Sequence, residues 1–130
     1  MARALAAATA AVALASLLLQ AWLSAADTVA RGGTVGEALF RLSGYFTILT
    51  NVVVAGVCAA LARGARLPEW LTAGTALWIG FVAAVYHLML AHLYDHRGWW
   101  AVADAGLHRA VPLLYLALWA WLLPKGGLAW

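Results

Sequence analysis

The chain has 130 residues, of which 66% are hydrophobic and 10% are charged, with a formal net charge of +3 and a mean hydropathy of +0.88. Soluble domains average about 45–50% apolar and about 25% charged residues, so this composition excludes a soluble protein. The eight basic residues are scattered rather than clustered, which argues against a nucleic-acid surface and predicts contacts with membrane lipids. We therefore predict an all-α, polytopic membrane protein with a single transmembrane domain over residues 1–130.

Four apolar runs predict a bundle of four transmembrane helices, near residues 4–25, 44–63, 70–93 and 104–123. The first run follows Arg3 and ends at small residues, so a secretory signal is an alternative interpretation. Its length and the membrane character of the remaining chain favour a retained helix. After this run, Thr34 and Glu37 match the capping-box pattern and predict a short interfacial helix.

An even number of spans places both termini on one side of the membrane, and the distribution of basic residues indicates which side. On the side of the termini lie four basic residues, Arg3, Arg63, Arg66 and Lys125. On the opposite side lie the other four, Arg31, Arg41, Arg97 and Arg109. Arg41 and Arg109 border the spans and can snorkel, so they count less. We therefore expect cytoplasmic termini, in the inner membrane of a bacterial cell.

The last span is predicted to hold a histidine inside the membrane. Residues 111–123 give only about 20 Å of apolar helix, whereas a bilayer core needs about 30 Å, so the span must reach back through His108 to about Asp104. Thr47, early in the second run, and His87, late in the third, lie at the same depth as His108, about 4–6 Å below the outer interface. We predict that these three side chains meet in one pocket.

Neighbouring residues support this pocket. Asn51 lies one helical turn after Thr47 on the same face. His87 continues a stripe of small residues at three- and four-residue steps, so we expect both His87 and His108 to point into the bundle. Pro112 has no N–H group, so we expect the carbonyl of His108 to lose its usual helical donor.

A hydroxyl and an imidazole at one depth are typical of nucleophilic catalysis. We expect Thr47 to be the nucleophile and His108 its general base, because an imidazole titrates near neutral pH. Candidates for orienting the base are Asp104 and His87, and candidates for stabilising an oxyanion are Asn51 and Arg109. The pocket opens toward acyl chains, so the expected substrate is a lipid ester, and we expect neither a metal nor a cofactor.

Three motifs occur in order over residues 38–130: Tyr45-Phe46-Thr47 with Asn51, Leu107-His108-x-x-x-Pro112, and Pro124-Lys125-x-x-Leu128-x-Trp130. Together they resemble the androgen-induced integral membrane protein family, whose animal members are threonine-dependent hydrolases of fatty-acid esters of hydroxy fatty acids. The resemblance implies that Thr47 is the nucleophile and His108 the family histidine. Members of the family have more helix after the Pro-Lys motif, so we expect this chain to be a fragment or a minimal form.

Two other interpretations stay open at this point. His87 and His108 on neighbouring helices could be the axial ligands of a haem in a four-helix bundle. The polar layer could also be structural, with its side chains only joining helices by hydrogen bonds and no chemistry taking place.

Overall fold

The computed structural model describes residues 1–126, and these residues form helices with no strand among them. The last two matched positions of the third motif, Leu128 and Trp130, lie outside the described residues. In chain order, the elements are α1 (Ala2–Ala30), α2 (Val35–Ser43), α3 (Phe46–Ala62), α4 (Glu69–Val85), the π-helical turn η1 (Tyr86–Leu90), α5 (Trp99–Ala105), the π-helical turn η2 (Gly106–Ala110) and α6 (Val111–Leu122). The all-α prediction is therefore confirmed for the described chain.

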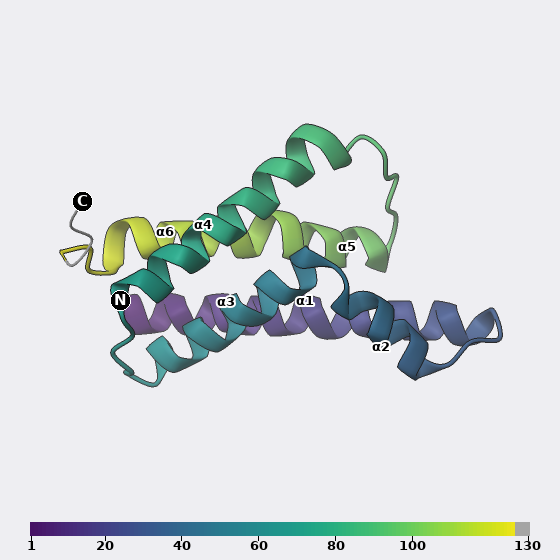
Figure 1. Cartoon of the computed structure of the whole chain (residues 1–130), viewed down its shortest axis with the longest axis horizontal. Coiled ribbons are helices and arrows are strands. Elements are labelled where there is room, and N and C mark those ends of the chain that lie inside the picture. Colours follow the sequence, from purple (N-terminus) through teal and green to yellow (C-terminus); the bar gives the residue numbers. More distant parts are fainter. Residues whose placement is uncertain (127–130) are drawn as a thin grey trace.

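Three helical segments are long and apolar enough to cross a membrane: α1, the segment Glu69–Leu90 and the segment Trp99–Leu122. The pair α2 and α3 would make a fourth span if the two helices act together, although they meet at an angle of 84°. Figure 1 shows that α1 begins and α6 ends at the same end of the bundle, whereas α2, η1 and α5 gather at the opposite end. This opposite end holds the polar residues that the sequence singled out.

Two helix boundaries differ by five residues from those expected. α1 continues to Ala30 rather than ending near residue 25, because Asp27 and Arg31 form an ion pair one turn apart that supports a further polar turn. The last segment begins at Trp99 rather than near residue 104, directly after Gly98, which has a φ of 59° and turns the chain into the helix. Asp104 therefore lies within the segment instead of at its start.

Small side chains allow α1 and α3 to pack closely, and Figure 1 shows the two helices lying along each other. Ala6, Ala10 and Ala13 of α1 are buried in the same core cluster as Val54 and Cys58 of α3. Cys58 is fully buried, which fits its interpretation as a small core residue.

The interfacial helix predicted after the first span is α2. Thr34 Oγ1 accepts a hydrogen bond from the Glu37 N–H at 3.2 Å, and Glu37 Oε2 accepts one from the Thr34 N–H at 2.7 Å. The capping box is therefore confirmed. The sharp bend between α2 and α3 turns α2 away from the direction of the span that follows it.

Candidate active site

Pro112 determines where the last segment exposes a backbone acceptor. The N–H of Val111 donates to the carbonyl of Gly106, five residues earlier, because the chain forms a π-helical turn there. Continuing that pattern, Leu107 would accept from residue 112, but proline has no N–H. The Leu107 carbonyl instead accepts from Asn51 Nδ2 at 3.3 Å. The structure thus shows a freed acceptor on Leu107, one residue before the His108 carbonyl that the sequence singled out, because the π-helical turn adds the Leu107 carbonyl to the acceptors that Pro112 leaves without a donor.

Asn51 joins the start of α3 to this turn. Its side chain is fully buried, and Nδ2 donates both to the Thr47 carbonyl at 2.9 Å and to the Leu107 carbonyl at 3.3 Å. This shared amide links the backbone of Thr47 to that of Leu107, the residue before His108, whereas the meeting of the Thr47 and His108 side chains in one pocket stays a prediction. Because both amide hydrogens already have acceptors, Asn51 has no donor left for the oxyanion role expected of it.

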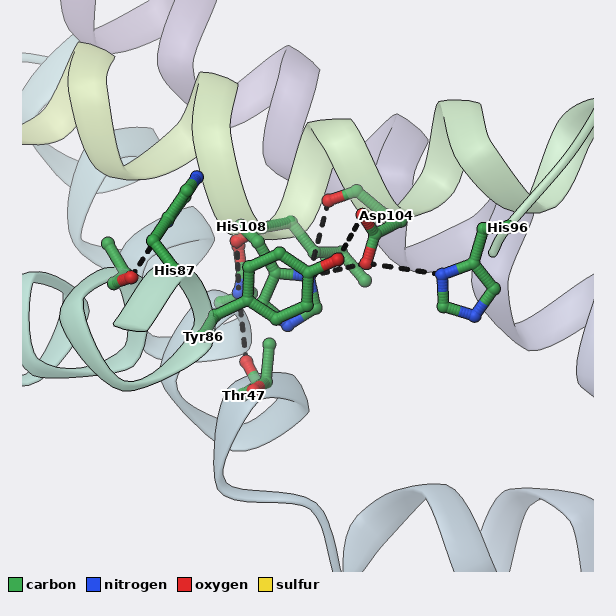
Figure 2. Close-up of polar contacts among 9 residues, drawn as sticks. Thr47, Tyr86, His87, His96, Asp104 and His108 are labelled. Carbon is green, nitrogen blue, oxygen red and sulfur yellow. Dashed lines mark hydrogen bonds and ion pairs between the residues drawn. The ribbon is translucent and has the colours of Figure 1, made fainter. Parts of the chain in front are cut away.

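His108 is held by the residue one turn before it. Its Nδ1 lies 3.1 Å from Asp104 Oδ1 and 3.2 Å from the Asp104 carbonyl, and the His108 side chain is only 16% exposed. An acceptor on the Nδ1 side favours the tautomer that carries hydrogen on Nδ1, which leaves Nε2 free to accept a proton. Figure 2 shows the other edge of this ring turned toward Thr47 at the start of α3. Among residues 1–126, no hydrogen bond joins the Thr47 hydroxyl to the ring.

Tyr86 completes the cluster, and the sequence did not single it out. Its hydroxyl donates to Asp104 Oδ2 at 2.6 Å, and its ring stacks on the imidazole of His108 with centroids 3.8 Å apart and an angle of 16° between the planes. Tyr86 is the first residue of η1 and is buried. In the sequence, a tyrosine within an apolar helix is interpreted as a packing residue. Only the contact with Asp104 in the structure indicates that Tyr86 belongs to the polar cluster.

A second histidine approaches the same carboxylate from the loop that follows η1. His96 Nδ1 lies 3.6 Å from Asp104 Oδ1, and its side chain is 35% exposed (Figure 2). The sequence assigned no role to His96, because eight residues separate it from Asp104 and no helical spacing relates them. The carboxylate of Asp104 is therefore surrounded by three potential hydrogen-bond donors, from Tyr86, His96 and His108.

The expected inward position of His87 is wrong. His87 is exposed, and its Nδ1 lies 2.8 Å from the Ala83 carbonyl of its own helix. The buried stripe of this segment is offset from the small-residue stripe and ends at Tyr86, which takes the inward position. Arg109 is exposed as well, and in the described chain the only ring contact of His87 with the cluster is an edge-on one to Tyr86, so neither candidate is turned inward as the supporting role requires.

Comparisons of the chain with protein-family models, with curated proteins and with solved structures gave no match. The fold and the site by themselves define a helical protein with membrane-span-like helices and a buried tyrosine–aspartate–histidine cluster. The resemblance to the androgen-induced family stays a prediction, and the geometry of the cluster carries the functional argument.

Proposed function

We propose that the chain is an intramembrane hydrolase of fatty-acyl esters, with Thr47 as nucleophile and His108 as general base. The observation that carries this proposal is the Asp104–His108 pair, in which Nδ1 faces the carboxylate while the opposite edge of the imidazole is turned toward Thr47 (Figure 2). A carboxylate that orients an imidazole next to a hydroxyl is the arrangement that activates a weak oxygen nucleophile.

The reaction would proceed in two steps. As the Thr47 hydroxyl attacks the ester carbonyl, His108 Nε2 takes its proton, and the imidazolium is stabilised by Asp104. His108 then returns the proton to the leaving alcohol, and an acyl-threonine ester remains. In the second step the same imidazole takes a proton from water as the water attacks the acyl-threonine ester. The bond between the acyl carbon and Thr47 Oγ1 breaks, the fatty acid leaves, and the imidazolium returns the proton to Oγ1. Asp104 keeps its position throughout, because its Oδ2 accepts a hydrogen bond from the Tyr86 hydroxyl.

The proposal includes four membrane spans, with α2 and α3 acting as one bent span. The 17 residues of α3 are about 25 Å long, somewhat short of the bilayer core of about 30 Å, and the turn before them can complete the crossing. Thr47 is the second residue of α3 and would lie near the interface, where the ester groups of membrane lipids are found. A lipid ester could therefore reach the site from the bilayer.

The haem alternative receives less support from the site. The ring of Tyr86 covers a face of the His108 imidazole, and His87 contacts Tyr86 with ring centroids 5.4 Å apart. His87 is also exposed, and its Nδ1 lies 2.8 Å from the Ala83 carbonyl, so it is not held inside the bundle as the second axial ligand of a buried haem would be. Haem binding would also produce a Soret band, which the hydrolase does not predict.

Labelling of the purified protein with a fluorophosphonate probe tests the mechanism. We expect Thr47→Ala to abolish labelling and His108→Ala to reduce it about 100-fold, with the double variant no worse than Thr47→Ala because the two residues act as one unit. Thr47→Ser keeps a hydroxyl and should retain labelling. Loss of the same lipid-ester hydrolysis in the same variants would support the assignment.

Thr9→Ala is the matched control. Thr9 is buried and its hydroxyl donates to the Leu5 carbonyl at 2.8 Å, so the substitution removes a similar buried hydroxyl elsewhere in the bundle. Its labelling should equal that of the parent. A folded parent that neither labels nor hydrolyses a lipid ester would refute the hydrolase, and equal losses of stability in all threonine variants with no change in labelling would favour a purely structural polar layer.

A further inference from the structure

A second concave site lies away from the cluster, between the C-terminal end of α1 and α2. Its volume is about 420 Å³, and it is lined by Thr28, Arg31, Gly33, Glu37, Phe40 and Arg41. An adjoining cavity of about 130 Å³ shares Thr28, Arg31 and Arg41 and is also bordered by Asp27, which pairs with Arg31, and by Tyr45 and Trp100. We call the two together the α1–α2 cleft. Nothing in the proposed hydrolase mechanism uses it.

The length of α1 places this cleft at the level of lipid headgroups. The 29 residues of α1 are about 43 Å long, which matches a bilayer of about 40–45 Å including both headgroup layers, whereas the hydrocarbon core is only about 30 Å. The last turns of α1 therefore emerge from the hydrocarbon. α2 carries exposed apolar side chains beside the cleft, with Leu39 49% and Phe40 80% exposed, which is typical of a helix in contact with acyl chains.

The charges in the larger cavity favour an anion. Two arginines and one glutamate line it, and Glu37 Oε2 already accepts the N–H of Thr34 in the capping box. Arg31 pairs with Asp27, whereas Arg41 makes no ion pair within residues 1–126. The Thr28 hydroxyl accepts from Arg41 Nη2 at 2.7 Å, which fixes the guanidinium at the cleft and leaves most of its N–H groups for a ligand.

We propose that the α1–α2 cleft binds the phosphate of an anionic phospholipid through Arg41, with Arg31 as a second contact. A guanidinium in a fixed orientation matches the oxygens of a phosphate, and basic pockets at the ends of transmembrane helices are suited to lipid headgroups. The acyl chains would lie along Leu39 and Phe40, which is why a lipid rather than free phosphate is the expected ligand. This site is independent of ester hydrolysis.

Native mass spectrometry of the detergent-purified chain with added phospholipids of identical acyl chains tests the proposal. We expect the parent to retain one phosphatidylglycerol at a concentration at least ten times below that needed for phosphatidylcholine, whose cationic group would meet Arg31. Arg41→Gln should weaken phosphatidylglycerol retention about tenfold, and Arg41→Lys, which keeps the charge but loses the planar fork, should lie between the two. Inorganic phosphate at millimolar concentration should not displace the lipid.

Arg66→Gln is the matched control, because Arg66 is an exposed arginine in the turn between α3 and α4, far along the chain from the cleft. It should leave the preference for phosphatidylglycerol unchanged. If Arg41→Gln does not fold, Arg31→Gln and retention by the parent at rising salt serve the same purpose, since both should weaken the contact. Equal retention of the two lipids by the parent, equal effects of Arg41→Gln and Arg66→Gln, or displacement by inorganic phosphate would each overturn the proposal.

Discussion

Among single residues, Asp104 has the most consequential surroundings. A buried carboxylate is costly unless hydrogen bonds compensate for the lost water, and here Tyr86, His108 and His96 lie at 2.6, 3.1 and 3.6 Å from its oxygens. Asp104 Oδ2 accepts the hydrogen bond from Tyr86, whereas Oδ1 faces the two histidines. Tyr86 thus holds the group that holds the proposed base, and we regard it as a positioning residue.

Tyr86→Phe keeps the ring that stacks on His108 but removes the hydrogen bond to Asp104. We expect fluorophosphonate labelling of Thr47 to fall about tenfold and thermal unfolding to show a loss of about 1.5–3 kcal/mol, the usual effect of removing a hydrogen bond to a charged group. Tyr115→Phe is the control, because the buried Tyr115 hydroxyl donates to the Thr72 carbonyl at 3.0 Å, outside the cluster. It should lose similar stability and keep its labelling. Equal labelling in both variants would rule out the positioning role.

Among the elements, the two π-helical turns are what bring the site together. η1 begins at Tyr86 and η2 contains Leu107 and His108, so each turn supplies part of the cluster from a different candidate membrane-spanning segment. π-Helical turns are rare and are frequently found at functional sites, because the extra residue redirects side chains and frees backbone groups. In η2 the freed group is the Leu107 carbonyl that Asn51 binds.

The position of η2 against α1 depends on a glycine. A Cβ atom at Gly106 would overlap the side chain of Ser16 on α1, so only glycine permits this close approach. We expect Gly106→Ala to lower the free energy of unfolding by about 1–3 kcal/mol, as overpacking usually does, and to reduce labelling by displacing the cluster. Thermal unfolding in detergent and probe labelling would measure both effects.

Two further variants make this prediction specific. Ser16→Gly removes the clashing side chain, so in the Gly106→Ala background it should restore more stability than it costs in the parent. Gly74→Ala, in the middle of α4, adds a Cβ where no atom lies within 4 Å and should be neutral or slightly stabilising. If Gly106→Ala and Gly74→Ala behave alike, the close approach is not as tight as described.

For the whole molecule, the proposed four spans and the predicted cytoplasmic termini would place the segment before α3 and the turn after it on opposite sides of the membrane. In a Cys58→Ala background, a membrane-impermeant maleimide added to intact spheroplasts should label Gly36→Cys and spare Ala65→Cys until the membrane is permeabilised. Both positions are exposed in the fold. Labelling of both from outside would show that α2 and α3 do not cross, and labelling of Ala65→Cys alone would reverse the orientation.

The sequence by itself determined the features that depend on composition and on residue spacing within one helix. The apolar runs identified the membrane class, the Thr34–Glu37 pattern identified α2, and the four-residue spacing of Asp104 and His108 identified a pair that lies in contact. Each follows from the 3.6-residue helical repeat and from local hydrogen bonding.

Only the tertiary structure decided which side chains from different helices meet. Tyr86 reaches Asp104 across 18 residues of chain and Asn51 reaches Leu107 across 56, and neither contact is encoded in a local pattern. The stripe of small residues placed His87 inward, whereas the packing of α4 turned the neighbouring tyrosine inward and left His87 exposed. Adjacent positions of a helix point about 100° apart, and a π-helical turn changes which of them faces a given side. The spacing of residues in the sequence therefore cannot tell which of the two is buried, because the neighbouring helices determine it.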